Sequence, residues 1–81
     1  MAKKIRSINF VFRKTQFATD IKASRIELGY SLDDVAKESR ITDGQIGRYE
    51  QGKEDNMKLQ NFLDICNLYD LNPQDYFELE A

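Results

Sequence analysis

The chain has 81 residues, of which 41% are hydrophobic and 32% are charged, and its formal net charge at pH 7 is −2. A chain of this length forms one small domain that buries only about 60% of its unfolded surface. It has no histidine, one cysteine and no glycine-rich nucleotide-binding motif, which excludes the usual nucleophile–base pairs, an internal disulfide and a multi-cysteine zinc site. We therefore expect a protein that is not an enzyme and that needs neither a cofactor nor a metal.

No apolar run approaches the length of a membrane span, and the first residues lack the apolar core of a signal peptide. The lone Cys66 fits a reducing compartment. We therefore expect a cytoplasmic protein that makes no contact with a membrane.

The charges are unevenly distributed along the chain. Residues 1–25 carry a net charge of +6, and the remaining residues carry −8. Such a molecule can present its basic end to phosphate and its acidic end to solvent or to a partner.

The first predicted element is a strand. In the segment 5–12, IRSINFVF, the apolar residues Ile8, Phe10 and Phe12 alternate with other side chains, a period typical of a strand. In a helical domain this strand has no sheet to join, so it either pairs with the same segment of a second subunit, packs on another partner, or remains a flexible basic arm. We divide the chain into an N-terminal arm, residues 1–14, and a helical domain, residues 15–81.

The next element is a helix capped by Thr15, which spans about residues 16–28 and ends at Gly29. Its spacing places Phe17, Ile21 and Leu28 on the inward face.

The segment 31–52 predicts two short helices joined by a tight turn. Ser31 precedes Asp34 by three residues and Thr42 precedes Gln45 by three, so each pair fits a capping box at a helix start. Gly52 suits the left-handed conformation that ends a helix. Apolar side chains at helical spacing would face a shared core: Val35, Ala36, Ile41, Ile46 and Tyr49. This arrangement is that of a helix-turn-helix.

Two further helices are predicted after a polar loop at residues 53–56. The buried stripe of the fourth would consist of Leu59, Phe62, Leu63, Cys66 and Tyr69, and Asp70 would end it. Asn72, Pro73 and Asp75 supply a cap, a first-turn proline and an early acid, so we expect a short fifth helix that contains Tyr76, Phe77 and Leu79. The predicted fold is all-α with five helices.

These residues resemble the phage-repressor and Cro-type (lambda-repressor-like) helix-turn-helix family from about residue 21 to residue 77. The matching positions are Arg25, Leu28 to Ser31, Val35, Ala36, Ile41, Thr42, Ile46 to Lys53, and Leu71 to Pro73. The resemblance implies five helices and binding to double-stranded DNA, with the third helix in the major groove. It also implies an ion pair between Arg25 and Glu50 that ties the first helix to the end of the third.

If the third helix enters the groove, the resemblance places a set of its residues at the bases and phosphates: Thr42, Asp43, Gly44, Gln45 and Arg48. The fork of Arg48 can pair with two acceptors of guanine; alternatively, Arg48 pairs with an acid such as Glu38 or touches phosphate only. Gln45 can pair with adenine or touch the backbone, but it also serves the capping box.

Other basic and polar residues would position the protein on the duplex without reading sequence. Gln51 and Lys53 lie in the loop that approaches phosphate. The arm residues Lys3, Lys4 and Arg6 either reach an adjacent groove or form an ordinary solubilising tail.

Three residues depart from the family pattern. Leu32 replaces a glutamine that often touches phosphate, and Arg40 replaces the usual glycine of the turn, where it can add a phosphate contact but strains a left-handed backbone. Asp43 places an acid at the groove, which repels phosphate but can accept a hydrogen bond from the cytosine amino group.

The sequence favours a DNA-binding transcriptional regulator, most simply a repressor that acts as a homodimer on an inverted repeat. The dimer contacts would come either from residues 8–12 or from Tyr76, Phe77 and Leu79. The alternative is a protein-interaction module, such as a regulatory subunit or an antitoxin-like inhibitor, that keeps the same fold.

Overall fold

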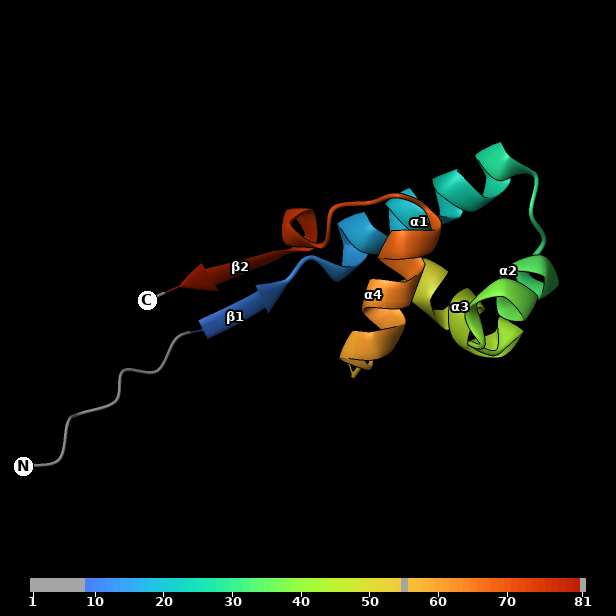
Figure 1. Cartoon of the computed structure of the whole chain (residues 1–81). Coiled ribbons are helices and arrows are strands. Elements are labelled where there is room, and N and C mark those ends of the chain that lie inside the picture. The colour runs from blue at the N-terminus through green and yellow to red at the C-terminus, as the bar shows by residue number, and fades with distance from the viewer. Residues whose placement is uncertain (1–8, 55, 81) are drawn as a thin grey trace, which may run out of the picture.

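The computed structural model of the chain describes residues 9–54 and 56–80. A short strand, β1 (Asn9–Phe12), leads into the helices α1 (Lys14–Leu28), α2 (Leu32–Ser39), α3 (Asp43–Glu50) and α4 (Leu59–Leu68). A single turn of 3-10 helix, η1 (Pro73–Tyr76), and a second strand, β2 (Phe77–Glu80), complete the described part of the chain. In Figure 1 the two strands extend together from one side of the helical body, and α2 and α3 lie at the opposite side.

The prediction of a fifth α-helix is wrong, because the described residues contain four α-helices. The Asn72 side chain accepts a hydrogen bond from the amide of Gln74 at 3.1 Å, so the predicted cap is present. It starts only one 3-10 turn, because the following residues Phe77–Glu80 are extended and pair with β1.

The two strands form an antiparallel sheet in which Phe12 lies opposite Phe77 and Asn9 lies opposite Glu80. The expectation that β1 lacks a sheet partner within its own chain is therefore wrong. The pairing is reinforced by the amide of Arg13, which donates to the carbonyl of Tyr76 at 2.7 Å, and by an ion pair between Arg13 and Glu78.

Aromatic rings connect this sheet to the helical body. The Phe12 ring lies 5.7 Å from the Phe17 ring and 5.5 Å from the Phe62 ring, centroid to centroid. Phe17 in turn lies 5.2 Å from Tyr76, whose hydroxyl donates to Asp20 at 2.8 Å. These distances suit edge and tilted ring contacts, so the end of β1 shares one aromatic core with α1, α4 and η1.

The first helix begins two residues earlier than predicted. Its N-cap is Arg13, which makes no side-chain capping bond, and Thr15 lies inside the first turn, where its carbonyl accepts a hydrogen bond from the Thr19 hydroxyl. The prediction that Thr15 caps the helix is wrong because the tertiary bond from Arg13 to Tyr76 already fixes the chain ahead of this turn.

The buried hydrophobic core is drawn from every helix: Phe17, Ala18, Ile21, Val35, Ile41, Ile46, Tyr49, Phe62, Ile65, Cys66 and Tyr76. Three leucines predicted to face inward are instead exposed, namely Leu28, Leu59 and Leu63. Leu28 is the last residue of α1, and α4 turns the face made by Phe62, Ile65 and Cys66 inward, which leaves Leu59 and Leu63 to one side. None of the helices in the described ranges is long and apolar enough to span a bilayer.

Candidate nucleic-acid interface

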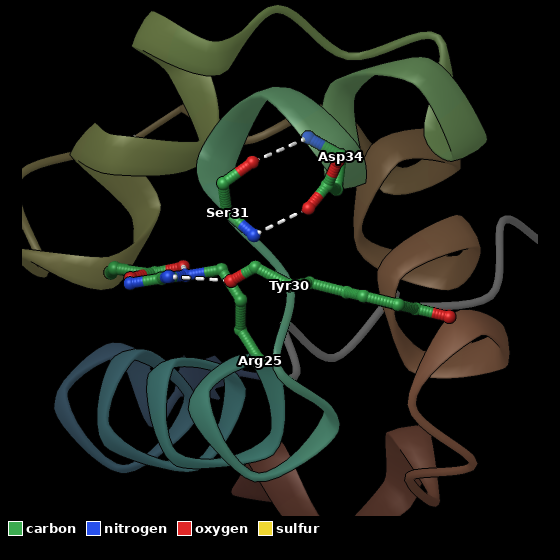
Figure 2. Close-up of polar contacts among 5 residues, drawn as sticks. Arg25, Tyr30, Ser31 and Asp34 are labelled. Carbon is green, nitrogen blue, oxygen red and sulfur yellow. Dashed lines mark hydrogen bonds and ion pairs between the residues drawn. The ribbon is translucent and has the colours of Figure 1, made fainter.

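The start of α2 is fixed by a reciprocal capping box. The Ser31 amide donates to Oδ2 of Asp34 at 2.8 Å, and the Asp34 amide donates to Oγ of Ser31 at 3.1 Å. Figure 2 shows both bonds closing the first turn of the helix. The bonds to the Ser31 backbone and side chain lower the pKa of the Asp34 carboxyl, because they favour its charged form. The capping box predicted from the sequence is therefore present.

The turn between α2 and α3 contains a strained residue and a buried hydroxyl. Arg40 has φ of 64°, in the left-handed region that disfavours residues with a Cβ. The adjacent Ser39 hydroxyl donates to the Val35 carbonyl at 2.7 Å and accepts from the Ile41 amide at 3.2 Å. The sequence analysis did not identify Ser39. Its position immediately before the turn could have indicated this role, because a serine there can satisfy backbone groups at a helix end.

The start of α3 is capped from one side only. The hydroxyl of Thr42 accepts from the Gln45 amide at 3.2 Å. The reciprocal bond from the Gln45 side chain, which the sequence predicts, is not formed between these two described residues, so Gln45 does not have the double role expected of it. Asp43 also bends back, and its Oδ1 accepts from the Gly44 amide at 2.8 Å.

The two faces of α3 differ sharply in burial. Ile46 and Tyr49 are 1% and 3% exposed and anchor the helix to the core. The residues proposed to meet DNA, Thr42 to Gln45 together with Arg48, are all exposed. The polar side of α3 is therefore open in the monomer, as entry into a groove requires.

The acidic residue that pairs with Arg48 is not the one that the sequence suggested. Its Nε lies 3.3 Å from Oε2 of Glu54, in the loop after α3, and not beside Glu38. The side chain of Arg48 is 57% exposed, so the pair lies at the surface. Sequence reasoning missed Glu54, because it lies outside the helix and reaches Arg48 only after the chain reverses.

The chain reverses at Gly52, which has φ of 67°. The amide of Lys53 then donates to the Arg48 carbonyl at 3.1 Å. This turn brings the exposed residues Gln51 and Lys53 close to the end of α3. Arg40 is exposed as well, at the other end of α3, whereas Lys3, Lys4 and Arg6 lie outside the described residues.

An ion pair joins α1 to the end of α3. Nε and Nη2 of Arg25 contact Oε2 and Oε1 of Glu50 at 2.7 and 3.0 Å. Nη1 of Arg25 donates to the Tyr30 carbonyl at 2.9 Å, as Figure 2 shows. The hydrogen bonds that Arg25 donates to the Glu50 carboxylate raise the pKa of Arg25. The pair therefore holds α3 at a fixed angle to α1 and to the loop before α2.

The hydroxyl of Tyr69 lies in the same region and has no hydrogen-bond partner among the described residues. Burial, with a smaller contribution from the charge of Glu50, raises the pKa of Tyr69 to about 12. Tyr69 therefore stays neutral at physiological pH.

The described part of the chain holds no cluster of His, Cys, Asp and Glu suited to a metal ion. Cys66 is buried, and burial raises the pKa of its thiol to about 11. A neutral, buried thiol is a poor nucleophile, so Cys66 is a core residue.

A family model described as a helix-turn-helix domain matches residues 20–81. The chain belongs to the helix-turn-helix domain family. The resemblance to the Cro-type helix-turn-helix proteins is thereby confirmed. Among curated proteins, no relative matches the chain.

Solved structures of similar fold include the following three. The restriction-modification controller protein C.AhdI from Aeromonas hydrophila shares 24% identity over 75% of this chain and 91% of its own, with a TM-score of 0.65. The biofilm master regulator SinR, solved in complex with DNA, shares 22% identity over 72% of this chain and 92% of its own, with a TM-score of 0.63. The DNA-binding domain of BldD from S. venezulae shares 25% identity over 78% of this chain and 93% of its own, with a TM-score of 0.62.

Proposed function

We propose that this helix-turn-helix protein is a sequence-specific DNA-binding transcriptional regulator that acts in the cytoplasm. The observation that carries the proposal is the exposure of Thr42 to Gln45 and Arg48 on α3, whose opposite side is anchored by Ile46 and Tyr49. A rigid helix with a free polar face at the surface suits the major groove of B-DNA, which admits an α-helix.

Within this proposal the contacts divide into two kinds. Arg48, Gln45 and Asp43 would contact base edges, and Thr42 and Gly44 would allow close approach of the helix start. Arg40, Gln51 and Lys53 would contact phosphate, and the basic residues Lys3, Lys4 and Arg6 would add phosphate or groove contacts from the N-terminal segment.

We further propose that the protein binds an inverted repeat as a homodimer and represses by blocking a promoter. A single domain that places one short helix in the groove contacts only a few base pairs, and two-fold symmetry doubles the contacts. Because β1 pairs with β2 within the chain, a dimer interface through β1 would require a free edge of this two-stranded sheet.

The proposal is tested by selecting duplexes from a random pool with the purified protein. We expect enrichment of one sequence with two-fold symmetry and a steep fall in affinity as salt rises, because released counterions drive phosphate binding. Sedimentation of the complex should give two protein chains per selected duplex. Failure to retain any duplex at low salt would contradict DNA binding, and one chain per duplex would contradict only the homodimer.

The alternative, a protein-interaction module, draws support from Asp43. Its carboxylate is exposed at the start of α3, where it would repel phosphate. If this alternative holds, the same selection retains no duplex, and Asp43→Asn does not restore retention.

A further inference from the structure

Glu54 links the loop after α3 to α3 itself, the helix that we propose enters the major groove. Its Oε2 lies 3.3 Å from Nε of Arg48, and its Oε1 accepts a hydrogen bond from the Asn56 amide at 3.4 Å. The Glu54 side chain is 26% exposed, compared with 57% for Arg48. Glu54 is thus the more fixed partner of the pair, since both of its oxygens are engaged.

The backbone places Glu54 at this position. The left-handed turn at Gly52 and the bond from the Lys53 amide to the Arg48 carbonyl fold the loop back against α3. An acid two residues after Gly52 therefore reaches the side chain of Arg48, although the two residues are separated by the end of the helix.

We propose that Glu54 is a specificity-determining positioning residue that acts through Arg48. It holds the guanidinium by Nε, which leaves Nη1 and Nη2 free to pair with the two acceptors of a guanine. The inference rests on the proposed function, since it concerns how the DNA-binding face of α3 distinguishes a specific site from random DNA.

The charge of Glu54 gives the mechanism. An arginine without an acidic partner binds phosphate at any sequence, and such contacts supply most of the affinity for random DNA. The Glu54 carboxylate offsets the charge of Arg48, so Arg48 attracts a phosphate less strongly. Glu54 therefore weakens binding to random DNA more than binding to a site where a guanine is in reach, which is how a repulsive element increases specificity.

The test compares the affinities of the wild type and Glu54→Gln for the selected duplex and for a random duplex of equal length. Glutamine preserves the size of the side chain and an oxygen that accepts hydrogen bonds, but it removes the charge. Because an exposed ion pair contributes little, we expect affinity for the random duplex to rise roughly two- to fivefold while affinity for the selected duplex changes less. The ratio of the two affinities should therefore fall.

Glu27→Gln is the matched control. It removes one negative charge from an exposed residue of α1 that makes no hydrogen bond or ion pair with α3 in the described part of the chain, so it should leave the ratio of the two affinities unchanged. In an Arg48→Ala background, Glu54→Gln should also leave the ratio unchanged, because its effect passes through Arg48.

A purely structural role for Glu54 would lower the melting temperature and alter both affinities together. An unchanged ratio in Glu54→Gln, or a fall that persists in the Arg48→Ala background, overturns the inference while the wild type still selects its sequence. If the wild type retains no duplex at all, the proposed function fails, and the inference fails with it.

Discussion

Arg25 and Glu50 meet in a two-point contact, with Nε to Oε2 at 2.7 Å and Nη2 to Oε1 at 3.0 Å, that joins α1 to the last residue of α3. Their side chains are only 16% and 6% exposed. Charged groups with so little access to water are stabilised mainly by each other. The contact therefore fixes the orientation of α3 from the side opposite to its exposed face.

We expect Arg25→Ala to lower the free energy of unfolding by about 3 to 5 kcal/mol, because it leaves the Glu50 carboxylate buried without its partner. Chemical denaturation would measure the change. Lys37→Ala is the control, since it removes a pair with Asp33 whose side chains are 73% and 67% exposed, and it should change stability by less than about 0.5 kcal/mol. Equal effects of the two variants would show that the Arg25 pair does not hold the fold.

The capping box gives a prediction about pH. The pKa of Asp34 is lower in the folded chain than in the unfolded chain, so its stabilising contribution is present above the unfolded pKa of about 4 and is lost as pH falls through the folded pKa. We expect Asp34→Asn to melt at a lower temperature than the wild type at pH 7. The two melting curves should converge in acid.

Asp33→Asn is the control for this pH dependence, because it removes the neighbouring carboxylate and leaves the bonds between Ser31 and Asp34 in place. At pH 7 its melting temperature should differ from that of the wild type by less than the melting temperature of Asp34→Asn does. A gap between the wild type and Asp34→Asn that stays constant from neutral pH to below pH 3 would contradict a role for the charged carboxylate.

Tyr69→Phe should leave stability at pH 7 unchanged or raise it, because it removes a buried hydroxyl that has no partner among the described residues. The variant should also resist alkali better. The pKa of Tyr69 is about 12 in the folded chain and about 10 in an unfolded one. Ionisation of Tyr69 in the unfolded chain therefore lowers the free energy of unfolding as pH rises above about 10. Thermal melts at pH 7 and pH 11 would measure both effects, and a marked loss at pH 7 would show that the hydroxyl makes a bond.

Arg40→Gly should raise the free energy of unfolding by about 0.5 to 1 kcal/mol, because glycine adopts the left-handed backbone at φ of 64° without the Cβ clash. It should also weaken DNA binding at all sequences alike if Arg40 contacts phosphate. Gly29→Ala is the converse control: at φ of 75° and with no neighbour near the added Cβ, it should destabilise by about 1 kcal/mol. Destabilisation by Arg40→Gly would mean that the arginine side chain outweighs the backbone strain.

The sequence predicted the helix-turn-helix well because its signals are local. Ser31 and Asp34 lie within one helical turn, as do Thr42 and the Gln45 amide, so the two helix starts follow from spacing alone. The inward positions Val35, Ile46 and Tyr49 follow from the same periodicity.

The parts that the sequence did not predict depend on contacts between distant residues. The segment Phe77–Glu80 follows good helix-start signals, but it is extended because it pairs with residues 9–12 at the other end of the chain. Glu54 reaches Arg48 only because the backbone reverses at Gly52. Helical spacing also cannot decide which of several leucines of α4 faces the core, and only packing leaves Leu59 exposed.

The central claim is that the exposed face of α3 enters the major groove. Its most direct test is an amide chemical-shift titration of the labelled protein with the selected duplex. We predict that the largest shifts fall on Thr42 to Arg48 and on Lys53, with small changes along α4. Large shifts on α4 or the β1–β2 sheet, with the amides of α3 unmoved, would contradict the account.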